Sequence, residues 1–216
     1  MPPTGLLSPE QISLIKAWID QGAEWPDDLA GEKAPTSPDP RAARIMETHC
    51  SGDRQTFMRL LREDPGAVKL KGAGSSKPLM YAALYGDAAS VRELLERGSD
   101  PNTANDAGAT ALMWAVEDFE KARLLVEHGA EVNAMSIDSR TALAIALGNR
   151  GSAAVVKLLL DHGASVEAKS YRGRSMFAGA GGDDAVLRAL IEHGVDTARL
   201  SPGFGLGAGI QLHGLR

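Results

Sequence analysis

Hydrophobic positions recur along residues 75–198 with a spacing that predicts helices, and the same pattern returns four times. In each copy the apolar residues fall three and four positions apart, which suits one buried face of an amphipathic helix. Each run closes on a glycine, where a positive φ past the last helical turn costs nothing. These glycines are Gly98, Gly129, Gly163 and Gly194, at nearly equal intervals along the chain. Self-similarity at this period predicts a stack of repeated units.

A second, shorter motif lies upstream of each amphipathic run and opens an alanine-rich stretch. Its four copies are Lys77-Pro78-Leu79-Met80, Thr110-Ala111-Leu112-Met113, Thr141-Ala142-Leu143-Ala144 and Ser175-Met176-Phe177-Ala178. We interpret each copy as the start of a first helix, whose small residues allow the second helix to pack closely. The predicted unit is therefore helix, tight turn, helix and polar loop. The separation between this motif and the closing glycine varies slightly, and we expect the variation to fall in the turn between the helices.

These segments resemble ankyrin repeats, whose family pattern runs Gly-x-Thr-Pro-Leu-His-x-Ala-Ala, then Leu-Leu, then Gly-Ala-Asp-Val-Asn-Ala. The polar loops Ala130-Glu131-Val132-Asn133 and Ala164-Ser165-Val166-Glu167 match the end of that pattern. The resemblance implies an all-α solenoid of stacked helix-turn-helix units. The family's histidine is replaced by methionine or alanine in all four motifs, which removes side-chain hydrogen bonds between neighbouring repeats. We therefore expect softer packing here than in the family.

A weaker unit precedes the four clear repeats, because Gly52-Asp53 lies one repeat period before Gly86-Asp87. We interpret it as a degenerate first repeat, since the end units of a stack are atypical. The repeat domain is thus expected over 41–198. The predicted repeats are 41–73, 74–106, 107–137, 138–171 and 172–200. The glycine-rich tail 201–216 is interpreted as a truncated further repeat, because its glycines do not fit a dinucleotide-binding motif.

Residues 1–26 predict a short helix, with Ser8 as its N-cap and Gly22 at its end. The Met-Pro-Pro start and the stretch Trp18-Ile19-Asp20-Gln21-Gly22-Ala23-Glu24-Trp25 resemble the C-terminal end of a bacterial class I cytochrome c domain. In that family the Met-Pro-Pro methionine is an axial haem ligand, so Met1 would be that ligand in a longer cytochrome c and ankyrin fusion. The CxxCH haem-attachment motif is missing from this chain, so no cofactor is predicted. The alternative is a solvent-facing helix with a start methionine. Residues 27–40, with three prolines, predict an extended linker.

Charge is unevenly distributed along the 216 residues, which hold 23 Lys and Arg against 28 Asp and Glu. The segment 1–40 carries seven acids and two bases, so the deficit of −5 lies there. A neutral main body argues against nucleic acid and anionic membranes as partners. The sequence offers neither a membrane-spanning stretch nor a signal peptide. We expect a cytoplasmic location for the chain as given, or a periplasmic one within a longer exported fusion.

No enzyme signature, metal site or disulfide is predicted. Cys50 is the only cysteine, and its neighbour His49 cannot face it within one helix. His128, His162 and His193 occupy one repeat position, in the last helical turn. Stacked helices lie about 8–10 Å apart, whereas zinc needs nitrogen ligands about 2 Å away, so we interpret these histidines as C-terminal helix residues.

The ankyrin resemblance implies a protein partner, bound by a monomer on the concave side formed by loop tips and first helices. The groove is expected to be acidic near Asp106, Glu117 and Asp118 and then basic near Arg140, Arg150, Arg172 and Arg174, and aromatic residues are the expected anchors. For Trp114 packing between repeats is the alternative role. The candidate partner-binding residues are Tyr81, Tyr85, Asp106, Trp114, Glu117, Asp118, Asp138, Arg140, Asn149, Arg150, Tyr171, Arg172 and Arg174.

Overall fold

The computed structural model describes residues 37–166 and 183–195, together with Ser13 and Ala17, which lie in helical backbone. Contacts divide the chain into two units, Met1–Thr36 and Ser37–Arg216, and the second unit holds the repeats. The cytochrome-like segment with Met1, the tail 201–216, and the candidate residues Tyr171, Arg172 and Arg174 lie outside the described residues. The domain and repeat boundaries given above remain predictions.

The described part of the repeat unit is built from α-helices and short 3-10 turns. The helices are α3 (Pro40–Ser51), α4 (Arg54–Glu63), α5 (Pro78–Tyr85), α6 (Ala88–Glu96), α7 (Ala111–Trp114), α8 (Phe119–Glu127), α9 (Ala142–Ala146), α10 (Ala153–Asp161) and α11 (Asp184–Glu192). The 3-10 turns are η1 (Pro65–Lys69) and η2 (Ala73–Ser75). No strand occurs in residues 37–166 and 183–195, where one isolated bridge joins Ala104 to Thr110. The prediction of an all-α fold is confirmed.

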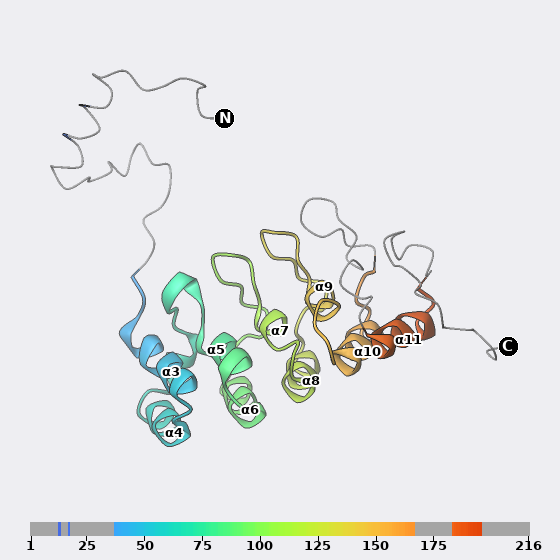
Figure 1. Ribbon diagram of the computed structural model, residues 1–216. Helices are drawn as coiled ribbons and strands as arrows, with labels where there is room; N and C mark the ends of the chain where they lie inside the picture. The colour runs from blue at the N-terminus through green and yellow to red at the C-terminus, as the bar shows by residue number, and fades with distance from the viewer. Residues whose placement is uncertain (1–12, 14–16, 18–36, 167–182, 196–216) are drawn as a thin grey trace. The chain divides into compact units, whose positions relative to one another are not determined.

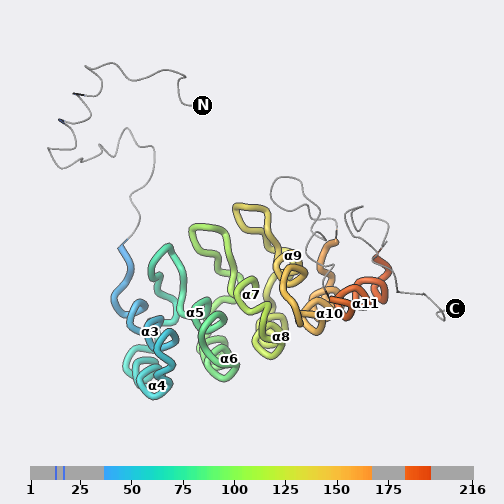
Figure 2. Tube along the Cα trace, viewed as in Figure 1, coloured from blue at the N-terminus to red at the C-terminus, as the bar shows by residue number. Residues whose placement is uncertain are grey.

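The helices form two layers, with loops projecting beyond one of them (Figures 1 and 2). In one layer α3 contacts α5, α5 contacts α7, and α7 contacts α9. In the other, α6 contacts α8, α8 contacts α10, and α10 contacts α11. Each first helix also packs on the second helix that follows it, as in α3 on α4 and α5 on α6. Each repeat therefore contacts only its neighbours, as expected for a stack.

The described second helices share two devices at their ends, each of them present in four of the five helices. An aspartate caps the N-terminus of four of them: Asp53, Asp87, Asp118 and Asp183 each accept a hydrogen bond from a backbone N–H in the first turn. The C-terminal glycines predicted from the sequence have φ values of 82°, 85°, 80° and 72°, in the left-handed region that glycine adopts without strain. The prediction of closing glycines is confirmed.

The length variation between repeats lies before the second helix. The second helices α6, α8, α10 and α11 are nine residues each. The first helices α5, α7 and α9 have 8, 4 and 5 residues, and the turn that follows lengthens from 86–87 to 115–118 and 147–152. Placing the variation in the turn alone was therefore wrong, because the first helix itself shortens.

One continuous hydrophobic core runs from Ile45 to Val195 through all the described repeats. In the three first-helix motifs that the structure describes, the leucine is fully buried, at 2%, 1% and 1% exposure for Leu79, Leu112 and Leu143. Full burial of such a side chain stabilises the fold by about 2 kcal/mol. Because these leucines sit at equivalent positions, the stack leaves the loops and the outward helix faces free for other roles.

Candidate protein-interaction surface

Three hairpin-like loops project from the layer of first helices, and we call them fingers. They are finger A (72–76), finger B (105–109) and finger C (136–140), and each is closed by a backbone hydrogen bond from its first residue to its last. The N···O distances are 2.7, 3.0 and 3.0 Å. In Figure 1 the fingers rise on one side of the first helices. Their equal construction places equivalent residues side by side along one edge.

Neighbouring fingers are joined by hydrogen bonds at equivalent positions. The backbone N–H of Asp106 in finger B donates to the carbonyl of Gly74 in finger A at 2.9 Å, and that of Ile137 in finger C donates to the carbonyl of Ala107 in finger B at 3.0 Å. Such backbone bonds each contribute about 1 kcal/mol. The fingers therefore form one connected edge instead of three independent loops.

Beside the fingers, three equivalent residues on α5, α7 and α9 form a half-buried row of large side chains. They are Tyr81, Trp114 and Ile145. The Trp114 ring packs edge-on against Tyr81 of the neighbouring repeat, with centroids 5.8 Å apart, and Tyr85 lies 6.1 Å from Tyr81 and is 57% exposed. Trp114 thus packs between repeats and still presents part of its surface. We call Tyr81, Tyr85, Trp114 and Ile145 the floor.

Three of the predicted charged residues lie on the fingers, as the sequence indicated. Asp106 is exposed on finger B, and Asp138 and Arg140 are exposed on finger C. Arg140 also closes its finger, because its backbone N–H donates to the hydroxyl of Ser136 at 3.1 Å. These three side chains are therefore exposed on the projecting loops of the stack.

Four other predicted residues were expected on first helices, and this placement was wrong. Glu117, Asp118, Asn149 and Arg150 follow the ends of α7 and α9 and lie in the turns before the second helices. The physical reason is capping, since Asp118 accepts a hydrogen bond from the N–H of Lys121 at 3.1 Å and starts α8. Asn149 and Glu117 form a bond of 3.4 Å between neighbouring turns. These turns join repeats to one another.

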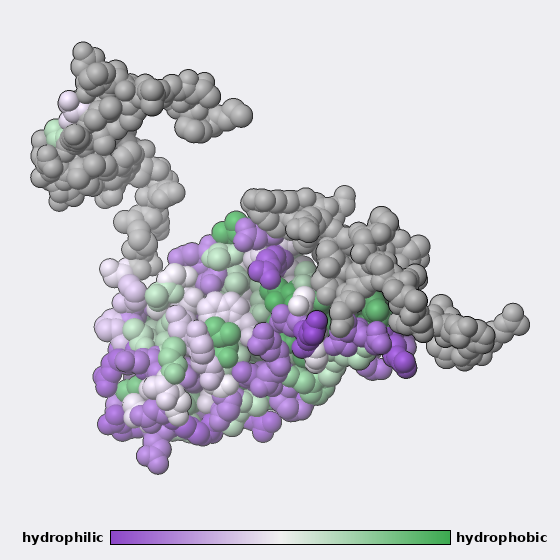
Figure 3. Space-filling model, viewed as in Figure 1, coloured by the Kyte–Doolittle hydropathy of each residue, from purple (hydrophilic) through white to green (hydrophobic). Residues whose placement is uncertain are grey.

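Sequence reasoning missed two exposed hydrophobic residues at finger C. Met135 and Ile137 are 60% and 75% exposed. Large apolar side chains on protein surfaces often mark interaction sites when they lie together. Figure 3 shows hydrophobic surface at the finger end of the described repeats, among hydrophilic side chains. The available signal was the alternation of apolar and polar residues in Met135-Ser136-Ile137-Asp138, within a stretch interpreted only as turn.

Sequence reasoning also missed the role of the recurring asparagines in the polar loops. The side-chain amide of Asn102 donates to the carbonyl of Gly129 at 2.9 Å, and its oxygen accepts from the N–H of Glu131 at 2.6 Å. One repeat later, Asn133 donates to the carbonyl of Gly163 at 2.9 Å and accepts from the N–H of Ser165 at 2.7 Å. Each asparagine therefore ties its loop to the closing glycine of the next repeat.

Replacing Asn133 with alanine is expected to lower the free energy of unfolding by about 2 kcal/mol, since two backbone groups of the next repeat lose a partner at about 1 kcal/mol each. Urea unfolding followed by circular dichroism measures this change. The control is Asn149→Ala, which removes one long bond of 3.4 Å and should change stability much less. Equal losses in the two variants would contradict the assigned role of Asn133.

The recurring histidines lie in the last turns of their helices, bonded to the backbone. The Nδ1 atoms of His128, His162 and His193 lie 2.7, 2.8 and 2.8 Å from carbonyl oxygens four residues earlier. His193 Nε2 also contacts the carboxylate of Asp161 at 2.8 Å, which raises the pKa of His193 and lowers that of Asp161. Within the described ranges, no three His, Cys, Asp or Glu side chains gather as metal ligands.

The adjacent pair His49 and Cys50 lies near the end of α3, and the two side chains differ in environment. His49 is buried at 5% exposure and Cys50 is exposed. The expectation that they do not face one another is confirmed. Among the helices of the described residues, none is long and apolar enough to cross a membrane.

Stacked helix pairs, connected fingers and closing glycines define a repeat scaffold of the ankyrin type. The family model described as ankyrin repeats in three copies matches residues 45–136 and 79–170, so the chain belongs to the ankyrin repeat family. The resemblance stated from the sequence is thereby confirmed for the repeats. The family model does not reach residues 1–26, so the cytochrome-like segment remains a resemblance.

Curated relatives share the repeats with this chain. Ankyrin repeat and SAM domain-containing protein 6 from Rattus norvegicus is 33% identical over 123 residues, which is 56% of this chain and 14% of that protein. Cyclin-dependent kinase 4 inhibitor B from Homo sapiens is 43% identical over 63 residues, 29% of this chain and 46% of that protein. The rat form of that inhibitor is 41% identical over 63 residues, 48% of its length. The chain thus spans less than half of these relatives.

Proposed function

We propose that the protein is a non-catalytic scaffold that binds a protein partner on the concave face formed by its fingers and floor. The observation that carries this proposal is the 75% exposure of Ile137 on finger C, together with the half-buried aromatic pair of Tyr81 and Trp114 on the first helices. Burying such side chains on association is favourable, and aromatic residues commonly dominate interfaces. Family membership supports a protein partner, and one relative is by its name an inhibitor of a protein kinase.

The kind of segment that the partner offers can be inferred from the apolar and charged side chains of the finger-and-floor face. Its apolar anchors are Ile137 and the exposed parts of Trp114 and Tyr85. Finger B carries the acidic Asp106, and finger C carries both Asp138 and Arg140. We infer a segment with apolar side chains for the floor and charges of both signs along its length, basic toward Asp106 and Asp138 and acidic toward Arg140. A monomeric state, the absence of a cofactor and the absence of catalysis are parts of the same proposal.

Photo-crosslinking of the protein in its native host tests the finger-and-floor face. A benzoyl-phenylalanine placed at Ile137 is expected to capture a protein that is not captured from Glu96, an exposed position on the second helix α6. The fold should tolerate both substitutions because both side chains are exposed. Equal capture of the same protein from both positions would count against the finger-and-floor face.

The affinity for the captured partner is expected to fall at least tenfold in Ile137→Asp, because a charged side chain replaces an apolar anchor of the interface. A tenfold loss of affinity corresponds to about 1.4 kcal/mol of binding free energy. Titration calorimetry measures the affinity, and Glu96→Ala is the matched surface control. Stability should stay unchanged, since Ile137 is outside the core. Unaltered affinity in a folded Ile137→Asp variant would remove Ile137 from the interface.

The proposal does not extend to the redox alternative, a cytochrome c fusion with the repeats as its docking part. That alternative rests on the resemblance of residues 1–26 alone, while the family model covers the repeats. A Soret band in the absorbance spectrum of a purified longer protein that contains this chain would support the alternative.

A further inference from the structure

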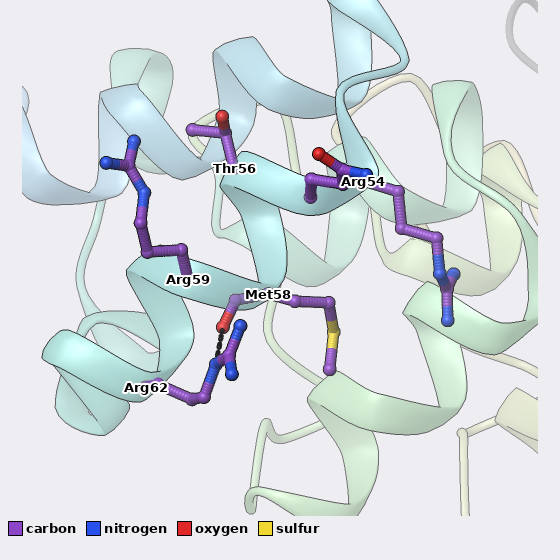
Figure 4. A pocket seen from close by; sticks show the side chains of 6 residues that line it. Arg54, Thr56, Met58, Arg59 and Arg62 are labelled. Carbon is purple, nitrogen blue, oxygen red and sulfur yellow. Dashed lines mark hydrogen bonds between the residues drawn. The ribbon is translucent and has the colours of Figure 1, made fainter.

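Helix α4 carries an arginine-rich outer face that the finger-and-floor surface does not use. Its buried side consists of Phe57, Leu60 and Leu61. Around the rest of the helix the side chains border a shallow hollow of about 600 Å³, seen in Figure 4. The lining residues are Arg54, Gln55, Thr56, Met58, Arg59 and Arg62. We call this surface the arginine face.

The arginine face differs in its charge from the other second helices of the stack. Helix α4 holds three arginines and one acid, whereas α6, α8, α10 and α11 each hold at least as many acids as bases. On α8 the single arginine is neutralised within its own helix, because Arg123 contacts Glu120 at 2.7 Å and Glu127 at 2.6 Å. The ion pairs of the described residues include neither Arg59 nor Arg62, although the pKa of the Asp53 carboxyl at the start of the helix is lowered by its hydrogen bonds with Thr56 and also by the charge of Arg59. Like charges at i and i+3 disfavour a helix, whereas Arg62 in the last turn suits the helix dipole and Arg59 stands four residues before Glu63.

The three arginines have different local tasks. Arg54 is a structural link between repeats, because its Nη1 lies 2.8 Å from both carboxylate oxygens of Asp87. Arg62 folds back along α4, and its Nε donates to the backbone oxygen of Met58 at 3.2 Å, as the dashed line in Figure 4 marks. That bond fixes the guanidinium and leaves both terminal nitrogens for a ligand. Arg59 and Arg62 are therefore the binding groups, and the side chain of Met58 lies as an apolar surface on the side of Arg62 that faces Arg54 (Figure 4).

We propose that the arginine face of α4 binds an acidic segment of a protein partner. Carboxylates of the segment pair with Arg59 and Arg62, since guanidinium groups match carboxylates in a two-pronged geometry. An apolar side chain of the segment covers the half-buried Met58. A nucleic acid fits less well, because it has no aliphatic side chain for Met58 and because Asp53 and Glu63 at the two helix ends limit the basic surface to a short stretch.

Fluorescence anisotropy with the full chain tests this surface. The probe is a labelled peptide in which single leucines separate pairs of glutamates. It is expected to bind, and to bind at least tenfold more weakly to the double variant Arg59→Glu with Arg62→Glu. Binding should also weaken as sodium chloride is raised from low to high concentration, because salt screens exposed charges.

Three controls make the outcome decisive. Arg92→Glu reverses an exposed arginine on α6 and should leave binding nearly unchanged. Circular dichroism should show the double variant folded, since both arginines are exposed; if it is not folded, Arg59→Gln with Arg62→Gln replaces it. A single-stranded oligonucleotide of matched length and label should bind more weakly than the peptide. Absence of peptide binding, equal binding by the folded double variant, or tighter binding of the oligonucleotide would each overturn the proposal.

Discussion

Acidification from pH 7 to pH 4 is expected to lower the free energy of unfolding by about 3 kcal/mol through His49 alone. This side chain is 5% exposed near the end of α3 and packs at a tilt against Phe57, with ring centroids 4.6 Å apart. Burial lowers its pKa from 6.5 to about 4, and the nearby Asp87 carboxylate offsets only part of that shift. The Nε2 atom has no hydrogen-bond partner in the described residues, so a proton there would be buried without compensation.

The direction of this effect follows from proton binding in the two states. Below pH 6.5 the histidine of the unfolded chain takes up a proton, while the folded chain resists protonation down to about pH 4. The unfolded state therefore binds more protons in this window, and stability falls as the pH falls through it. His193 acts in the opposite direction, because the carboxylate of Asp161 raises its pKa and favours the protonated folded form.

Urea unfolding at pH 7 and pH 4 measures the loss, and His49→Leu isolates it. The variant lacks the titrating ring, so its stability should fall by about 3 kcal/mol less than that of the natural chain over the same interval. His162→Leu is the control, because His162 is exposed and its removal should leave the loss in place. Identical pH dependence of the natural chain and His49→Leu would show that His49 is not the group responsible.

The repeat architecture could be predicted from the sequence because it depends on strong and recurring local signals. The helix ends are marked by glycines, which adopt the left-handed backbone conformation without strain. The structure has a positive φ at each of them, namely Gly98, Gly129, Gly163 and Gly194. Leu79, Leu112 and Leu143 mark the buried side of the first helices. Such signals act within one repeat and return at a fixed period, so each copy supports the others.

The interaction surface could be predicted only in part, because it depends on where short helices end and on contacts between repeats. Glu117 and Asp118 continue the helical spacing of α7, yet the helix ends at Trp114 and Asp118 caps the next one. The bonds of Asn102 and Asn133 to the next repeat likewise join residues that are distant in the sequence. A pattern along one chain segment does not specify such partners until the stack exists.

Replacing Gly108 with alanine is expected to destabilise the stack by about 3 kcal/mol and to disturb the finger edge. Gly108 has a φ of 70°, where an L-residue is strained by roughly 1–2 kcal/mol. An added Cβ would also lie 3.0 Å from the backbone nitrogen of Ile137 and 3.1 Å from the Cα of Ser136. Finger C must then give way by a few tenths of an ångström, which weakens the bond from Ile137 to Ala107 at a further cost of up to about 1 kcal/mol.

The control variant Gly129→Ala separates the backbone strain from the contact between fingers. Gly129 has a φ of 85°, and no atom lies within 4 Å of the added Cβ. It should cost only the strain, so the difference between the two variants measures the contact between fingers. Hydrogen exchange at the Ile137 amide should accelerate in Gly108→Ala and stay slow in Gly129→Ala, since only the first variant displaces finger C. Because Ile137 is the most exposed apolar anchor of the proposed face, the same displacement should weaken partner binding in Gly108→Ala alone. Equal stability and exchange in the two variants would mean that the fingers are not coupled through this contact, and that each finger presents its side chains independently.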